Sequence, residues 1–168
     1  MDKRPSPTSA LTVLRVEPFD SPSATAMLAA ADRTNTELYG HADQSSLSVD
    51  EFTRPQRGLF IVAHHNDAPV GCGGYRRHHE DADGLTAEIK RMYVEPAVRR
   101  LGIARAVLAR LEHDAQAAGY HTIILDTGSK QHAAHILYEQ CGYRRTASYG
   151  LYRDKPGNRA YIKSILRK

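Results

Sequence analysis

The segment from residue 86 to residue 118 constrains the fold of this 168-residue chain more than any other. Residues 86–94 form a run typical of a β-strand. Residues 103–118 carry apolar side chains at three- and four-residue steps, as one face of an amphipathic helix requires. Between them lies a short basic turn that contains Gly102. The segment therefore predicts a strand that leads through a tight turn directly into a helix.

That turn has the properties of an anion-binding site. The first N–H groups of a helix lack intrahelical acceptors, and the helix dipole favours negative charge beside them. Gly102 has no Cβ, so a phosphate can approach the main chain closely. Arg99, Arg100 and Arg105 add positive charge around the turn. We expect the turn to bind a ligand that carries a diphosphate, mainly through backbone groups.

The motif in the turn distinguishes between families of nucleotide-binding proteins. Neither G-x-x-x-x-G-K-[ST] nor G-x-G-x-x-G occurs in the chain, which excludes a P-loop and the dinucleotide fingerprint. Arg99, Gly102 and Ala104 instead form Arg-x-x-Gly-x-Ala, preceded by Tyr-Val-x-Pro. This pattern resembles the [Q/R]-x-x-G-x-[G/A] motif of the GNAT superfamily of acyl-CoA N-acyltransferases.

The resemblance extends on both sides of the turn. Residues 87–94 resemble the fourth strand of that superfamily, and a further strand is predicted at residues 121–126. Residues 134–143 are similar to its A-x-x-L-Y-x-x-x-G-[F/Y] signature. The good match covers residues 68–145, whereas residues 1–57 match only in the order of the expected elements.

The order of elements implies an α+β fold, an α/β three-layer sandwich in which a mixed, mostly antiparallel twisted sheet is flanked by helices. Strands are predicted at residues 11–16, 58–64, 70–75, 86–94, 121–126 and 159–166, and helices at residues 22–39, 103–118 and 131–141. Pro69 is expected in a turn or at a sheet edge, and residues 40–53 as an irregular surface loop that forms a wall of the acceptor site. Residues 1–10 are expected to be a disordered lead, and residues 11–168 a single domain.

Composition narrows the functional classes. The net charge of +4 comes from scattered Lys and Arg, which suits an anionic cofactor and speaks against nucleic-acid binding. No stretch is apolar enough to span a membrane, and the N-terminus has no secretory pattern. Cys72 and Cys141 are expected to be buried free thiols in a reducing cytosol, so we expect a cytoplasmic protein. The nine histidines lack zinc-site spacing, and no metal is expected. A homodimer remains open.

The resemblance implies an acetyl-CoA-dependent N-acetyltransferase. Such an enzyme binds acetyl-CoA and an amine acceptor together and transfers the acetyl group directly to a primary amine. We expect a small-molecule acceptor, with protein acetylation left open. The alternative is a non-catalytic acyl-CoA-binding regulatory module on the same fold. The presence of both Glu88 and Tyr138 favours the enzyme.

The resemblance also suggests roles for individual residues. Glu88 stands where the superfamily often has a general base, although a strand glutamate paired with Lys90 or Arg91 would look the same. Tyr138 stands where a tyrosine protonates the departing thiolate, and its alternative is a core tyrosine. The cofactor-binding residues implied are Met92, Tyr93 and Val94 along the pantetheine arm, Arg99, Arg100, Leu101, Gly102, Ile103, Ala104 and Arg105 at the phosphates, and Gln131 in place of the asparagine of many members.

Overall fold

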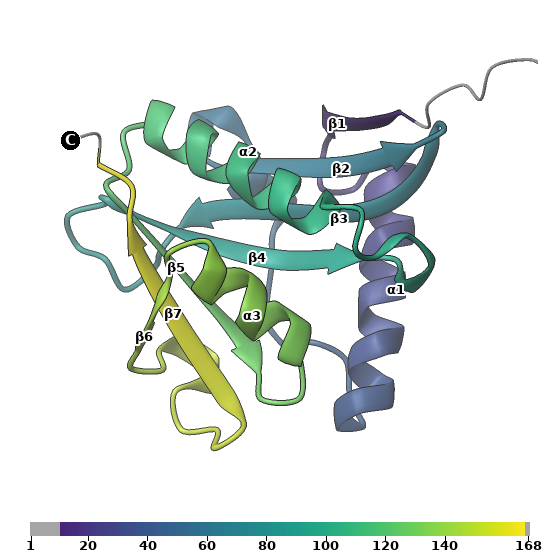
Figure 1. Cartoon of the computed structure of the whole chain (residues 1–168). Coiled ribbons are helices and arrows are strands. Elements are labelled where there is room, and N and C mark those ends of the chain that lie inside the picture. The colour runs from purple at the N-terminus through teal and green to yellow at the C-terminus, as the bar shows by residue number, and fades with distance from the viewer. Residues whose placement is uncertain (1–10, 167–168) are drawn as a thin grey trace, which may run out of the picture.

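The computed structural model describes residues 11–166, which form a seven-stranded sheet and three α-helices (Figure 1). The expected disordered lead, residues 1–10, lies outside the described residues. The elements are, in chain order, β1 (Thr12–Val16), α1 (Pro22–Tyr39), β2 (Leu59–His65), β3 (Ala68–Arg77), β4 (Thr86–Val94), α2 (Ile103–Ala117), β5 (Thr122–Gly128), α3 (His132–Gln140), β6 (Arg144–Thr146) and β7 (Asn158–Ser164).

The sheet has the order β1-β2-β3-β4-β5-β7-β6. All neighbouring strands are antiparallel except β4 and β5, which are parallel and are joined through α2. A parallel pair needs such a crossover, because a hairpin turn cannot connect two strands that run the same way. The predicted α+β fold with a mixed, mostly antiparallel sheet is confirmed.

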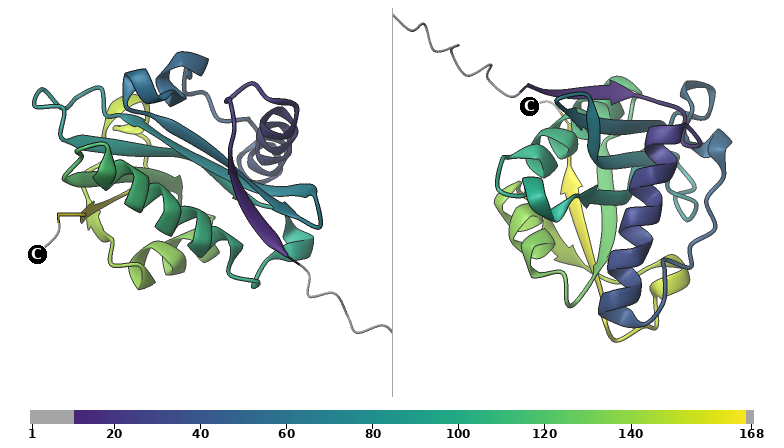
Figure 2. Two further views of the ribbon diagram at one scale, coloured as in Figure 1. Left: turned by 90° about the horizontal axis from the view of Figure 1, so that it is seen from above. Right: turned by 90° about the vertical axis from the view of Figure 1, so that its right-hand side faces the viewer.

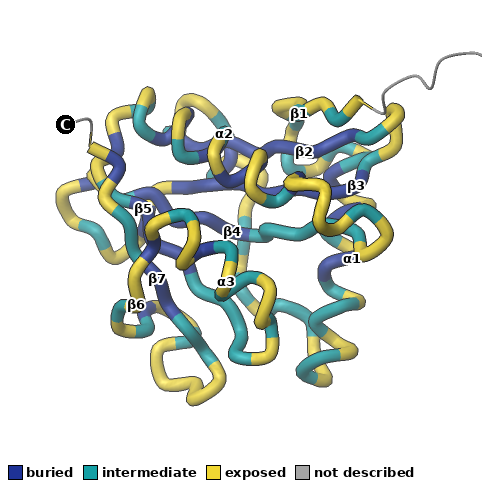
Figure 3. Tube along the Cα trace, viewed as in Figure 1, coloured by how far each residue is buried: buried dark blue, intermediate teal, exposed yellow. Residues whose placement is uncertain are grey.

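The helices form layers on both faces of the sheet. Helix α1 covers one face, whereas α2 and α3 cover the other (Figure 2). The larger core lies under α2 and α3 and includes Val107, Leu111 and Ile123. A smaller core under α1 contains Met27 and Phe60. The central strands are accordingly the most buried part of the chain (Figure 3).

Strands β4 and β5 pair over only part of their length. Residues 86–89 lie opposite residues 122–125, and beyond the pair Ile89–Leu125 the two strands diverge (Figure 1). A bulge in β4 coincides with this point, because three residues of β4 pass while β3 advances by two, from Cys72 to Gly74. Arg91, inside the bulge, has a φ of 60°, and bulges bend the strand that carries them. The sheet is therefore split at the centre of the molecule.

The helix boundaries follow the predicted signals. Ser21 caps α1, since its hydroxyl accepts the Ala24 N–H at 3.1 Å. Helix α2 buries Val107, Leu108 and Leu111, as its periodicity predicted. None of the helices within residues 11–166 is both long and apolar enough to cross a membrane.

Three expectations about local structure were wrong. The segment 40–53 is not wholly irregular: it contains a 3₁₀ turn at Val49–Phe52, and Phe52 is buried against Phe60. Pro69 lies inside β3, at a register shift in the ladder with β2, where a missing N–H is tolerated. Strand β6 was missed because it has three residues, too few for a periodic pattern.

The two cysteines differ in burial. Cys72 is buried as expected, and burial raises the pKa of its thiol to about 12. Cys141 is only half-buried, which corrects the expectation. It ends α3 at the surface, where its Sγ accepts a hydrogen bond from Arg105 Nη1 at 3.3 Å.

Candidate active site

A cleft of about 1160 Å³ opens where β4 and β5 part. One wall is the second half of β4 with the basic turn, which we define as residues 99–105. The opposite wall is the end of β5 with the start of α3. The end of α1 and residues 41–44 close a third side. The split in the sheet thus joins segments that are far apart in the sequence.

The basic turn lies at one end of the cleft. Arg100 and Gly102 both have left-handed backbone conformations, with φ of 66° and 76°, and α2 begins at Ile103. A Cβ at Gly102 would meet nothing within 4 Å, so the space before the helix N-terminus is open. An anion can therefore reach the free N–H groups of the first helical turn.

The predicted phosphate-binding residues line the cleft with one exception. Arg99 is fixed by a 3.1 Å hydrogen bond from its Nε to Val94 O, and Arg105 donates to Gln140 Oε1 at 2.8 Å. Leu101 is 61% exposed and does not line the cleft. The charge of the turn therefore comes from arginines on either side of an exposed leucine.

The open part of β4 supplies an unpaired strand edge. Met92, Tyr93 and Val94 line the cleft as predicted. On the side that faces β5, β4 has no ladder partner beyond Ile89 among residues 11–166. A strand edge of this kind presents N–H and C=O groups with which an extended, amide-containing ligand can form hydrogen bonds.

A set of contacts connects the end of α1 to the start of α3, and we name it the α1–α3 bridge (Tyr39, Gly128, Lys130, Gln131 and Asn35). Gln131 Nε2 donates to Asn35 Oδ1 at 3.2 Å, and Lys130 N–H donates to the Tyr39 hydroxyl at 3.2 Å. The Tyr39 hydroxyl lies so close to Gly128 that a Cβ there would overlap it. Because the Gln131 amide already donates to Asn35, its predicted contact with the cofactor would require the amide to bind Asn35 and the cofactor together.

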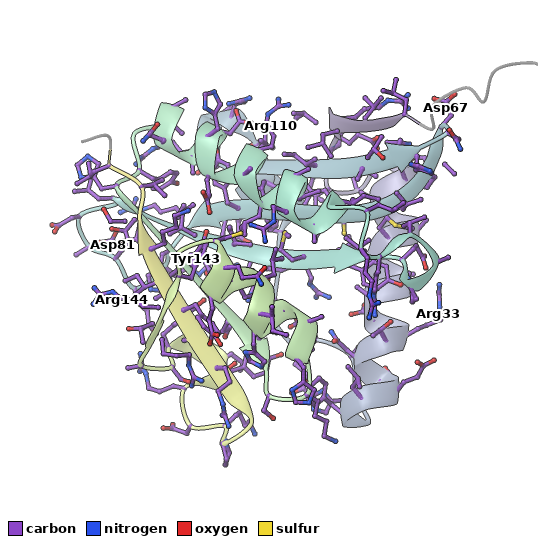
Figure 4. The ribbon with its side chains drawn as sticks, in the orientation of Figure 1. Arg33, Asp67, Asp81, Arg110, Tyr143 and Arg144 are labelled. Atoms are coloured by element: carbon purple, nitrogen blue, oxygen red, sulfur yellow. The ribbon has the colours of Figure 1, made fainter. Side chains whose placement is uncertain are left out.

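Tyr138 lines the cleft from α3. Its ring is 4% exposed and packs between Tyr143 and Tyr161, each with its centroid 5.8 Å away (Figure 4 labels Tyr143 beside α3). Burial, reinforced by the negative charge of Asp126, raises the pKa of the Tyr138 hydroxyl above its usual value. Within residues 11–166 this hydroxyl has no hydrogen-bond partner, so it is a protonated donor available to a ligand.

Glu88 is buried in a polar cluster beside the cleft and does not line it. Its carboxylate contacts Arg76 Nε at 3.1 Å and Lys90 Nζ at 3.3 Å. His78 Nδ1 is 3.8 Å away, too far for an ordinary hydrogen bond, so this contact is electrostatic. Burial opposes ionisation of Glu88, but His78, Lys90 and Arg76 together lower its pKa to about 2. The pair between Glu88 and Lys90 is one of the two ion pairs predicted from the sequence as the alternative to a general base.

Arg91 is engaged elsewhere. Its Nη1 donates to Asp32 Oδ1 at 2.8 Å, so the guanidinium joins β4 to α1. Its Nε lies 3.7 Å from Asp43 Oδ2. The predicted alternative of a pair with Glu88 is therefore not formed, because the bulge directs Arg91 toward α1.

Two cleft carboxylates were missed from the sequence. Asp126, directly after the buried part of β5, lies 3.8 Å from Lys90 Nζ, and its side chain is 10% exposed. Asp43 follows α1 and accepts the Tyr152 hydroxyl at 2.9 Å. A charged residue at the end of the apolar run 123–125 was the available signal for Asp126. Asp43 lies in a polar segment in which nothing distinguishes it.

Metal ligands do not cluster in the part of the chain that the structure describes. No group of three or more His, Cys, Asp or Glu side chains within residues 11–166 is arranged to hold a metal ion. The chemistry that this site offers comes from its anion-binding turn, its strand edge and its buried proton donors and acceptors.

Comparison with known proteins identifies what this arrangement resembles. A profile of the Acetyltransferase (GNAT) family matches residues 24–143. An IAA acetyltransferase from Azospirillum brasilense is 30% identical over 146 residues, which cover 87% of this chain and 92% of that relative. N-acetylaspartate synthetase from Rattus norvegicus is 32% identical over 112 residues, 67% of this chain and 36% of that relative.

Solved structures have the same fold. A Klebsiella pneumoniae protein assigned to the acyl-CoA N-acyltransferases superposes with a TM-score of 0.76 at 26% identity, over 93% of this chain and 99% of that one. The Salmonella typhimurium protein yncA, solved with its cofactor acetyl-CoA, superposes with a TM-score of 0.67 at 18% identity, over 94% and 95% of the two chains. The second comparison concerns the fold alone.

Proposed function

The chain belongs to the GNAT acetyltransferase family, and we propose that it transfers the acetyl group of acetyl-CoA directly to a primary amine in a ternary complex. The observation that carries the proposal is the cleft at the split of β4 and β5. It joins an anion-binding helix N-terminus at one end to a buried tyrosine donor, Tyr138, farther along. The diphosphate and the thioester are at opposite ends of the pantetheine arm of acetyl-CoA, and the cleft offers a group for each.

The binding roles follow from the geometry. The N–H groups at the start of α2, with Arg99, Arg100 and Arg105, would bind the pyrophosphate. The unpaired edge of β4 from Met92 to Val94 would form hydrogen bonds with the amides of the pantetheine arm. Most of this recognition uses the main chain, so it needs few particular side chains.

Tyr138 is proposed to protonate the thiolate that leaves when the thioester breaks. A phenol with a raised pKa stays protonated at neutral pH, and the Tyr138 hydroxyl has no competing partner among the described residues. Its ring is held by Tyr143 and Tyr161, which fixes the position of the hydroxyl oxygen. The hydroxyl would therefore act mainly in the transition state.

The acceptor is proposed to be a small amine. The relative named N-acetylaspartate synthetase supports nitrogen as the acceptor atom, although it is matched over only part of its length. The sequence predicted Glu88 as the general base, and a different residue is proposed for that role below. The cytoplasmic location, the homodimer and the extent of the domain over residues 11–168 remain predictions.

A panel of primary amines with acetyl-CoA, scored by release of free CoA, tests the function. We expect turnover with at least one small amine. CoA binding in calorimetry without turnover on any amine or peptide of the panel would favour the alternative, a non-catalytic acyl-CoA-binding module. Failure to bind CoA at all would contradict both.

A further inference from the structure

Two carboxylates lie on the same face of the sheet, on either side of the point where it splits. Side chains alternate along a strand, and Ile89 and Leu125 belong to the core under α2 and α3. Their neighbours Lys90 and Asp126 therefore point to the other face, the face of Glu88. Ile89 and Leu125 form the last β4–β5 pair, so Lys90 and Asp126 are the first side chains beyond it.

Asp126 and Glu88 compete for the same lysine. Lys90 Nζ lies 3.3 Å from Glu88 Oε1 and 3.8 Å from Asp126 Oδ1. Glu88 also has Arg76, whereas Lys90 is the only cation within ion-pair distance of Asp126 in the described residues. Asp126 thus lines the cleft with its side chain nine-tenths buried, and one distant lysine compensates its charge incompletely. A carboxylate in this environment tends to bind a second cation or a proton.

The remaining groups around Asp126 strengthen this preference. Burial raises the pKa of Asp126, the negative charges of Glu88 and Asp43 raise it further, and Lys90 lowers it. The amide of Asn158, on β7, lies within its reach and also lowers it. Tyr149 and Tyr152 face it from the segment between β6 and β7, and Asp126 in turn acts on their pKa values. The balance leaves the pKa above its usual value.

Asp126 also faces the proposed proton donor. After burial, its negative charge is the largest influence that raises the pKa of Tyr138. Tyr138 reaches the cleft from the face of α3, and Asp126 from the opposite face. Both side chains line the cleft and interact electrostatically across it, and each has a raised pKa, which favours a proton donor in Tyr138 and a proton acceptor in Asp126.

We propose, on the basis of the acetyltransferase function above, that Asp126 binds the ammonium group of the acceptor and removes its proton, and that Glu88 is a positioning residue that holds Lys90. The ammonium would replace the missing second cation beside Asp126. Lys90, fixed by Glu88, keeps Asp126 ionised until the acceptor arrives. A carboxylate with a raised pKa is also a stronger base than an ordinary surface aspartate.

The proposed step balances in atoms and charge. One N–H proton of the ammonium passes to an Asp126 oxygen, and the freed lone pair attacks the thioester carbonyl carbon. The C–N bond forms and the C–S bond breaks, with the electron pair leaving on sulfur. Tyr138 donates its proton to that thiolate and regains one from the nitrogen, which loses its second proton as it becomes an amide. The products are the N-acetyl amide, CoA thiol and the proton that Asp126 returns to solvent.

The test compares Asp126→Asn with Glu88→Gln, and uses Asp67→Asn, a surface aspartate at the β2–β3 turn, as a charge-matched control. For Asp126→Asn we expect kcat/KM for the amine to fall by about 100- to 10,000-fold at pH 7. The loss should shrink as pH rises, because free amine then needs no base. The KM for acetyl-CoA should not change. Glu88→Gln should lose about tenfold or less in kcat/KM, and the acidic limb of its pH profile should move to lower pH, because the negative charge that raises the Asp126 pKa is removed.

The outcomes separate the base from a structural role. Asp126→Asn that binds CoA and keeps the wild-type rate and pH profile would overturn the proposal, as would a pH-dependent loss in Glu88→Gln alone. Should Asp126→Asn fail to fold, Asp126→Glu retains a carboxylate: activity with a shifted pH profile supports the assignment, and an unshifted profile contradicts it. Wild-type protein that acetylates no amine would instead contradict the proposed function, and this inference with it.

Discussion

Strands β4 and β5 consist of two different regions, a paired half and an open half. Over residues 86–89 and 122–125 they are paired, and Ala87, Ile123 and Leu125 are almost completely buried. One residue later they part, and the side chains that follow are Lys90 and Asp126. Both of these charged side chains line the cleft that opens where the ladder is lost. Fold stability and ligand recognition are therefore assigned to opposite halves of the same strands.

The largest effect is expected from Gly102→Glu, at the far end of the open half. A carboxylate about 4 Å from a phosphate costs about 4 kcal/mol at the effective dielectric of a protein surface, which corresponds to about a thousandfold in affinity for CoA. Calorimetry with CoA measures it. Gly102→Ala is the control, since it introduces the same backbone strain at φ 76° without the charge. Equal losses in both variants would attribute the effect to strain.

The paired half is tested by Ile123→Ala. Ile123 is 0% exposed in the main core, so removing its side chain should lower the free energy of unfolding by about 2–5 kcal/mol. CoA affinity of the folded protein should remain near that of the wild type. Thr127→Ala, in the open half, should cost only about 1 kcal/mol, because it loses a single hydrogen bond to Gln131. Denaturant titrations that rank these variants in the opposite order would refute the division.

Tyr138→Phe tests chemistry in the open half without altering packing. Removing the O–H should lower kcat by about tenfold to a thousandfold with the KM for acetyl-CoA little changed. The smaller loss is favoured because a thiolate leaves readily. Tyr143→Phe, whose ring packs on Tyr138 but does not line the cleft, is the control and should retain the wild-type kcat. A folded Tyr138→Phe enzyme at full rate would show that Tyr138 is structural.

The two buried carboxylates are expected to differ in the pH dependence of stability. Glu88 has a pKa lowered from 4.5 to about 2, so its ionisation stabilises the fold above pH 4.5 and this contribution is lost as pH falls to about 2. Glu88→Gln should thus be less stable than wild type at pH 7, with the gap closing in that window. Asp126 has a raised pKa, so its ionisation destabilises the fold, and Asp126→Asn should melt slightly above wild type at pH 7. Melting temperatures are measured between pH 2 and 7. If both variants shift in the same direction relative to wild type, the two carboxylates do not have opposite effects on stability.

The sequence correctly predicted those features that depend on interactions between residues close together in the chain. The strand at Thr86–Val94, the turn at Gly102 and the apolar face of α2 all arise from neighbours within a few residues, and the structure has them as predicted. The partners of Glu88 depended on register instead. Arg76 comes from β3, and no pattern within β4 identifies it.

Asp126 was missed for the same reason. Asp126 is a candidate functional residue because it lies beside Lys90. Lys90 is on β4 and Asp126 on β5, and α2 separates these neighbouring parallel strands in the sequence. Leu101 shows the limit of a motif as well, because the Arg-x-x-Gly-x-Ala pattern includes a residue that faces solvent. Contacts that depend on where two strands separate cannot be derived from either strand alone.

The α1–α3 bridge has a mechanical consequence. Tyr39 packs against Gly128 with no room for even a methyl group, so the hydrogen atom of that glycine sets how closely α1 approaches β5. Any side chain at position 128 would displace the Tyr39 hydroxyl, and with it the hydrogen bond that this hydroxyl accepts from the Lys130 N–H. The contacts of Lys130 with Leu38 and of Gln131 with Asn35 would then be left to hold the end of α1. Gly128, a cleft residue without a side chain, thus determines how the end of α1 is attached to the cleft wall.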